Sequence, residues 1–180
     1  MIIDRGKVID ACKNAQTKYD LEWQLLYAIC LQEGQKSKTG EFDPAVARLE
    51  QGYYRAYVEN MDLATSSEIL LSASWGVMQL MGLSLLEMEY FEWYFNQCPE
   101  GMKAVLKGPR TQFAIPNALD AYAMDIDLMV DWGTQWLQGK IKQAKGNIWK
   151  GVLRWNGGGN AAYPDEVRSK YLLIKQGRLQ

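Results

Sequence analysis

Apolar residues recur at intervals of three and four along almost the whole chain, which is the spacing of one face of an α-helix. The first set of this kind consists of Val8, Ala11, Cys12, Ala15 and Tyr19. The next segment, from Leu21 to Glu33, is apolar on nearly every side, and Ile29 is its one β-branched residue. This composition predicts a central buried helix rather than a strand, and Gly34 is expected to end that helix.

Helical spacing continues through the rest of the sequence. The run Thr65-Ser66-Ser67-Glu68 has the spacing of a capping box and predicts a helix start just before Ile69. Further helices are predicted over 83–95, from Pro116 to Leu137, over 148–155 and from Pro164 onward, with a less regular stretch at 98–109. No repeat and no alternating strand of useful length is found, so the 180 residues predict one all-α domain, 1–180.

The chain contains no histidine. This excludes Ser-His-Asp hydrolases, Cys-His proteases and HExxH metalloenzymes, because each needs an imidazole. Twenty basic and 21 acidic side chains give a net charge of −1, which argues against nucleic acid as the main partner. The densest basic run, Lys140, Lys142 and Lys145, is interpreted as the solvated side of a helix.

Three cysteines, Cys12, Cys30 and Cys98, lie among apolar neighbours without a CxxC pair. They are interpreted as buried free thiols, and no metal site or cofactor is expected. The N-terminus lacks the apolar region of a secretory signal. The longest apolar run, Leu25 to Leu31, falls short of the about 20 residues that a membrane helix needs, so no membrane insertion is expected.

Glu33 is the most informative candidate for chemistry. On a helix it shares a face with Leu26, Ile29 and Cys30, so a carboxyl group closes the end of an apolar stripe. Desolvation there is expected to raise its pKa, and a carboxyl group that stays protonated near neutral pH suits general-acid cleavage of a glycosidic bond. The alternative is a helix-end glutamate whose carboxylate reaches water past Gly34.

Two glycine-containing segments are candidate ligand-binding turns. Ser74-Trp75-Gly76-Val77-Met78-Gln79 combines a permissive backbone with an amide that can donate to and accept from a sugar. Arg154-Trp155-Asn156-Gly157-Gly158-Gly159-Asn160 precedes Tyr163 and Tyr171, and it lacks the lysine of a phosphate loop. The alternatives are an ordinary turn into a buried helix for the first segment and a plain helix cap for the second.

In this order, the three features resemble the lytic transglycosylase family, which has a lysozyme-like fold. The resemblance covers about 21–171. The family's catalytic Glu is followed by Phe-x-Pro, here Phe42-Asp43-Pro44; by Gly-Leu-Met-Gln, here Gly76-Val77-Met78-Gln79; and by Tyr-Asn-x-Gly, here Trp155-Asn156-Gly157-Gly158. Residues 48–58 and Ala73-Ser74-Trp75-Gly76 look especially like the phage and prophage branch.

The resemblance implies cleavage of the β-1,4 bond between N-acetylmuramic acid and N-acetylglucosamine in peptidoglycan, with formation of a 1,6-anhydro ring. Glu33 would be the sole acid and base. The remaining site residues would bind or position the glycan: Ser74, Gly76, Met78, Gln79, Trp155, Asn156, Tyr163, Tyr171 and Glu50. The expected partner is the peptidoglycan strand, and the chain is expected as a monomer or as part of a phage or secretion assembly. It would be made in the cytoplasm and act at the cell wall or periplasm, including from a virion.

Three alternatives stay open. A hydrolytic muramidase needs a second carboxylate about 6.5–9.5 Å from the first, for which Glu50 and Asp43 are candidates, although Glu50 is favoured as a structural group. A silent wall-binding or virion structural protein is favoured by Gly34 and Trp155, which stand where the family usually has Ser and Tyr. The third is a helical partner-binding module with no glycan role. Among the aromatic residues, Trp23 and Trp136 are expected to be buried, and Trp75 and Tyr53 are the candidates to test for sugar contact.

Overall fold

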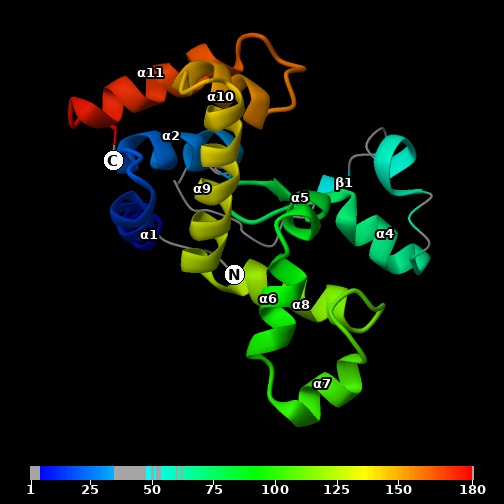
Figure 1. The fold of residues 1–180 in the computed structure, drawn as a ribbon. Coiled ribbons are helices and arrows are strands. Elements are labelled where there is room, and N and C mark those ends of the chain that lie inside the picture. The colour runs from blue at the N-terminus through cyan, green and yellow to red at the C-terminus, as the bar shows by residue number, and fades with distance from the viewer. Residues whose placement is uncertain are drawn as a thin grey trace.

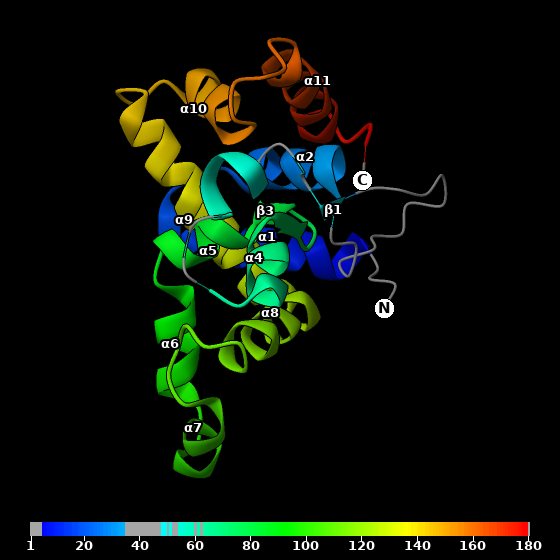
Figure 2. The same ribbon diagram turned by 90° about the vertical axis from the view of Figure 1, so that its right-hand side faces the viewer.

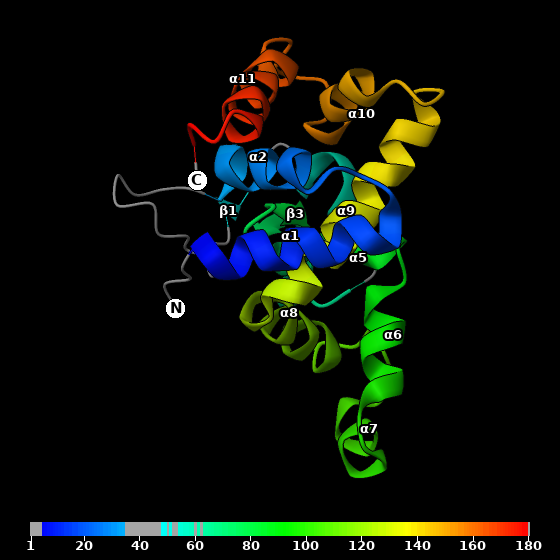
Figure 3. The same ribbon diagram turned by 90° about the vertical axis from the view of Figure 1, so that its left-hand side faces the viewer.

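The computed structural model describes residues 5–34, 48–49, 51, 54–59, 61 and 63–179, and its architecture is shown in Figures 1 to 3. It is 71% helix and 4% strand, which confirms the all-α class. The elements in chain order are α1 (Arg5–Tyr19), α2 (Trp23–Glu33), β1 (Arg48–Leu49), the π-helical turn η1 (Tyr54–Val58), α4 (Thr65–Leu71), β2 (Ala73–Trp75), β3 (Leu80–Met81), α5 (Gly82–Glu87), α6 (Tyr90–Gln97), α7 (Glu100–Leu106), α8 (Ala114–Met124), α9 (Ile126–Gln143), α10 (Ile148–Trp155) and α11 (Tyr163–Lys175).

Helix α2 is the central element, as its apolar composition predicts. All its residues from Leu25 to Leu31 are buried, and it ends at Glu33, followed by Gly34. Helices α1 and α11 pack against α2, while α9 packs against α1 and α10. Figure 3 shows α11 and α1 on opposite sides of α2. A helix apolar on every side is stable only when it is covered in this way.

A three-stranded antiparallel sheet lies beside these helices, in the order β1-β2-β3. Ser74 pairs with Arg48 on one side and with Met81 on the other. Strands of two or three residues are too short to show alternation, which is why the sequence analysis missed them. The turn between β2 and β3 is closed by a hydrogen bond from the Gln79 N–H to the Gly76 carbonyl oxygen at 3.1 Å.

Three predicted helical boundaries are wrong. Helix α4 starts at Thr65 with Ala64 at the N-cap, so the capping box does not form; instead Glu68 is buried and accepts a hydrogen bond from Tyr54 at 3.2 Å. The segment 83–95 divides into α5 and α6 at Glu89, whose φ is 62°. The stretch 98–109, expected to be irregular, contains α7.

The long helical stripe predicted from Pro116 is also divided. Helix α8 ends at Met124, and the Asp125 carboxylate accepts a hydrogen bond from the Leu128 N–H at 3.1 Å, which caps α9. An N-cap satisfies a backbone donor that the first helical turn leaves unpaired. This allows the apolar stripe to change direction, and Figures 1 and 2 show α8 with α6 and α7 at the end of the molecule away from α11.

Burial of the aromatic residues and cysteines follows the prediction only in part. The three cysteines are buried free thiols, as predicted. Trp23 and Trp136, expected to be buried, are only partly so, whereas Trp132 and Trp75 are 9% and 7% exposed. Among the described residues, no helix is long and apolar enough to cross a bilayer.

Candidate functional site

The end of α2 lies directly against the turn between β2 and β3. A Cβ atom built on Gly34 would lie 2.5 Å from the Val77 carbonyl oxygen, far inside van der Waals contact. No other residue fits at this position unless the backbone shifts. Gly34 is therefore required by the approach of α2 to the turn that carries Gln79.

Glu33 is joined to the start of α11. The Tyr163 hydroxyl, on a side chain 2% exposed, donates a hydrogen bond to Glu33 Oε1 at 2.6 Å. Burial raises the pKa of Tyr163, and the Glu33 charge and this hydrogen bond raise it further, although a hydrogen bond with Trp155 opposes the shift. Tyr163 is therefore a protonated donor at any ordinary pH. The length of the bond is that of an O–H group donating to a carboxylate.

The turn after β2 holds Gln79 in a defined orientation. Ser74 Oγ donates to Gln79 Oε1 at 2.9 Å, and Gln79 Nε2 donates to the Gly76 carbonyl oxygen at 2.9 Å. Gly76 has a φ of 75°, and a Cβ atom there would lie 2.4 Å from Met129 Sδ. Gly76 therefore supports the turn from within the protein, and its lack of a side chain serves packing against α9.

The glycine run after α10 forms a helix cap. Gly157 and Gly158 have φ values of 72° and 79°, and the Gly158 N–H donates to the Leu153 carbonyl oxygen at 3.0 Å. This is the left-handed ending that glycine permits. The two glycines thus form the helix cap of the alternative interpretation, and Gly157 and Asn156 also line a cavity.

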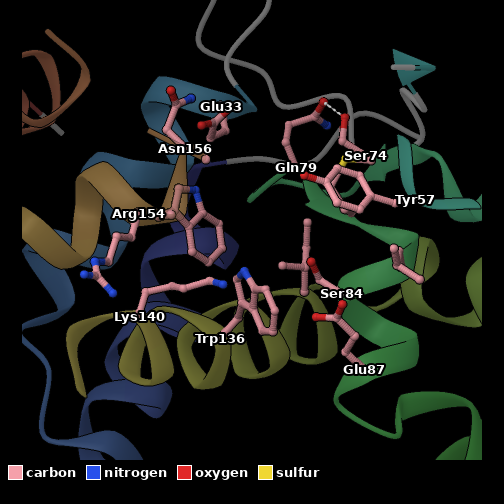
Figure 4. A pocket seen from close by; sticks show the side chains of 15 residues that line it. Glu33, Tyr57, Ser74, Gln79, Ser84, Glu87, Trp136, Lys140, Arg154 and Asn156 are labelled. Atoms are coloured by element: carbon pink, nitrogen blue, oxygen red, sulfur yellow. Dashed lines mark hydrogen bonds between the residues drawn. The ribbon is translucent and has the colours of Figure 1, made fainter. Parts of the chain in front are cut away.

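That cavity is about 620 Å³ in volume and contains five of the predicted site residues in its lining: Glu33, Ser74, Gln79, Trp155 and Asn156. In Figure 4, Glu33 and Asn156 lie on one side, and the hydrogen-bonded pair of Ser74 and Gln79 lies on the other. Folding therefore brings together the three motifs that are separated along the sequence.

Other predicted site residues lie elsewhere. Met78 is fully buried and does not line the cavity, so its side chain packs inside the protein. Tyr171 donates to Glu22 Oε2 at 3.0 Å, outside the cavity lining. Trp75 is also buried outside the lining, and its indole donates to the Leu70 carbonyl oxygen at 3.0 Å. Glu50, Asp43 and Tyr53 lie outside the described residues.

Several residues of the cavity lining were not predicted as site residues from the sequence. These are Tyr57, Ser84, Glu87, Trp136, Lys140 and Arg154. Lys140 Nζ lies 3.9 Å from the centre of the Trp136 ring, four residues earlier on α9. An aromatic residue and a lysine four positions apart on a helix share a face, and that spacing was the signal available in the sequence.

Glu33 and Glu87 are the carboxylates in the described lining of the cavity. Figure 4 shows them at separate ends, with the Trp136 and Lys140 side chains in the region between. No cluster of three potential metal ligands occurs within the described residues. The Glu33 carboxyl group can transfer a proton, and the amide and hydroxyl groups in the lining can form hydrogen bonds to a polar ligand.

Comparison with known proteins returns no relative: no family model, no curated protein and no solved structure matches this chain. The assignment of a function therefore rests on the residues that line the cavity and on the order of the motifs along the sequence.

Proposed function

We propose that the chain is a peptidoglycan lytic transglycosylase, with Glu33 as both general acid and general base. One observation carries the proposal. Glu33 closes the apolar face of a buried helix, receives a hydrogen bond from Tyr163 at 2.6 Å, and lines a cavity rich in hydrogen-bonding groups. A carboxyl group in such surroundings can exchange a proton with a bound glycan.

The reaction has two proton transfers. Protonated Glu33 donates its proton to the glycosidic oxygen as the C1–O bond of N-acetylmuramic acid breaks, and N-acetylglucosamine leaves with a free hydroxyl group. The Glu33 carboxylate then removes the proton of the muramic C6 hydroxyl, whose oxygen bonds to C1 and closes the 1,6-anhydro ring. The acid is restored and no water is consumed, so a second carboxylate is not required.

Tyr163 can stabilise the Glu33 carboxylate between these two proton transfers. Glu33 is then negatively charged, and a donated hydrogen bond favours the charged form of a carboxyl group. Because burial and the Glu33 charge raise the pKa of Tyr163, the phenol remains a donor and does not compete for the proton. Its fixed position also limits rotation of the Glu33 side chain.

The cavity has the size and polarity for a segment of glycan. Its volume of about 620 Å³ falls within the range of about 300–1,000 Å³ usual for ligand sites. The amides of Gln79 and Asn156 can pair with acetamido and hydroxyl groups, and Trp155 and Trp136 offer aromatic surface for a sugar ring. The bond between Ser74 and Gln79 at 2.9 Å orients one of these amides in advance.

A hydrolytic muramidase is the second candidate, because Glu87 lines the same cavity. An inverting hydrolase would use that carboxylate to activate water between the two acids. The position of Glu87 at the end away from Glu33 in Figure 4 favours the transglycosylase instead. Product mass separates the two reactions, because an anhydro product is lighter than a hydrolysed one by one water.

The test is mass spectrometry of the muropeptides that the protein releases from purified cell walls. We expect anhydro products from the wild type and from Glu87→Gln, and a rate about 10²–10⁴-fold lower from Glu33→Gln. Hydrolysed products lost in Glu87→Gln would establish the muramidase instead. Undiminished release by Glu33→Gln would refute the assignment of the acid, and no release by the wild type would favour a silent wall-binding protein.

A further inference from the structure

Two positively charged side chains belong to the cavity lining. These are Lys140 on α9 and Arg154 on α10. In Figure 4 the Lys140 side chain extends toward the Trp136 ring, while the Arg154 guanidinium lies on the far side of Lys140 from that ring. The Lys140 ammonium is 3.9 Å from the centre of that ring, a contact that holds the charge in place.

Among the described residues, neither cation forms a salt bridge with a carboxylate, and Glu87 acts on Lys140 only through its charge. Burial lowers the pKa of Lys140, and the Arg154 charge lowers it further, whereas the Glu87 charge raises it. A partly desolvated ammonium that forms no salt bridge with a described residue would gain from an anion that enters the cavity.

We propose that Lys140, supported by Arg154, binds a carboxylate carried by the glycan strand, so that the cavity selects acidic strands over neutral ones. This inference rests on the proposed function. Two substituents of N-acetylmuramic acid supply such a group: the lactyl carboxylate, when no peptide is attached, and the carboxylates of a peptide stem. Oligomers of N-acetylglucosamine carry neither substituent.

Glu87 sets the direction from which the carboxylate approaches. It also lines the cavity, and in Figure 4 it lies near Trp136. Besides Glu33, the charged residues of the lining are Glu87, Lys140 and Arg154, which are one negative and two positive groups. Repulsion by Glu87 disfavours a carboxylate on its own side and directs that group toward Lys140 and Arg154. Loss of the Glu87 charge is therefore expected to strengthen the binding of acidic strands.

The experiment compares dissociation constants in the full-length Glu33→Gln protein, which prevents turnover during the measurement. The three ligands are a neutral N-acetylglucosamine oligomer, a soluble glycan strand with free lactyl groups, and the same strand with peptide stems. The variants are Lys140→Met, which keeps an apolar stem beside Trp136, and Lys140→Arg, which keeps the charge. Lys142→Met is the matched control, because Lys142 is an exposed lysine on the same helix outside the cavity lining.

We expect Lys140→Met to weaken the binding of at least one acidic strand about tenfold, while binding of the neutral oligomer stays the same. Lys140→Arg should recover most of the affinity, and Lys142→Met should have no effect. The acidic strand whose binding is weakened by Lys140→Met shows whether the lactyl group or the peptide stem supplies the carboxylate. Equal effects of Lys140→Met on all three ligands, or no effect on any, would overturn the inference alone. A parent protein that binds none of them would overturn the proposed function and the inference together.

Discussion

The hydroxyl of Tyr163 donates a hydrogen bond of 2.6 Å to Glu33 Oε1 and thereby joins the last residue of α2 to the first residue of α11. The two residues are 130 positions apart in the sequence. Under the proposed function, Tyr163 supplies the phenol beside the acid. Lytic transglycosylases, which the sequence resembles, usually have a tyrosine before the Asn of their Asn-x-Gly motif, where this chain has Trp155.

Replacement of Tyr163 by Phe tests this hydrogen bond. A hydrogen bond to a charged group contributes about 1.5–3 kcal/mol, so we expect kcat for glycan cleavage to fall about 10–100-fold. KM should change little, because Tyr163 does not line the cavity. Tyr171→Phe is the matched control, since its hydroxyl bonds to Glu22 instead. Equal losses in both variants would indicate a general effect on α11 rather than a role at Glu33.

Gly34→Ser introduces the residue that lytic transglycosylases usually carry directly after the catalytic glutamate. Because the added Cβ atom would lie 2.5 Å from the Val77 carbonyl oxygen, we expect a loss of about 1–3 kcal/mol in the free energy of unfolding and no gain in activity. Urea denaturation measures this loss. Gly159→Ser is the control, because a Cβ atom there meets nothing within 4 Å, and its effect should stay within about 0.5 kcal/mol. Similar stability of the two variants would contradict the close approach of α2 to the turn.

Ser74→Ala tests the orientation of Gln79. The Gln79 carboxamide then loses the donor 2.9 Å from its oxygen, and its side chain samples more rotamers. We expect KM for glycan strands to rise severalfold with kcat nearly unchanged, because proton transfer at Glu33 is not altered. Ser169→Ala is the control, since that exposed hydroxyl bonds to the Asp165 carbonyl oxygen within α11. A fall in kcat without a change in KM would contradict the assigned role of Gln79.

The buried tyrosines predict a loss of stability at alkaline pH. Burial raises the pKa values of Tyr90, Tyr122 and Tyr163 in the folded protein, whereas tyrosines in the unfolded chain ionise near pH 10. Above that pH the unfolded state binds fewer protons than the folded state. The free energy of unfolding therefore falls by up to about 1.4 kcal/mol per pH unit for each such tyrosine, and their contribution is complete below pH 10.

Urea denaturation between about pH 8 and 11.5 measures this dependence. Tyr122→Phe keeps the ring and removes the ionisable hydroxyl, so its stability should fall less steeply with pH than that of the wild type. Loss of its hydrogen bond to the Met129 carbonyl oxygen lowers the stability of the variant at every pH and does not affect the slope. If the free energy of unfolding falls with the same slope against pH in both proteins, Tyr122 does not contribute to the pH dependence.

Local signals in the sequence were sufficient for much of the fold. The spacing of apolar residues identified α1, and the apolar composition of 21–33 identified α2, because each signal lies within the helix itself. The boundary at Asp125 was missed although Asp is a favourable N-cap residue, because the apolar stripe continues on both sides of it. The sheet was missed because its strands have at most three residues each.

The sequence by itself determined that the chain is helical, that α2 is buried, and that a carboxyl group stands at the end of its apolar face. These properties depend on residues that lie within a few helical turns of one another in the sequence. Only the tertiary structure decided which donor meets Glu33, why position 34 is glycine, and that Lys140 rather than Trp75 lines the cavity. These relationships depend on how α2, α9, α11 and the β2–β3 turn pack together. Packing is determined by the shapes and volumes of residues that are far apart in sequence, which local spacing does not record.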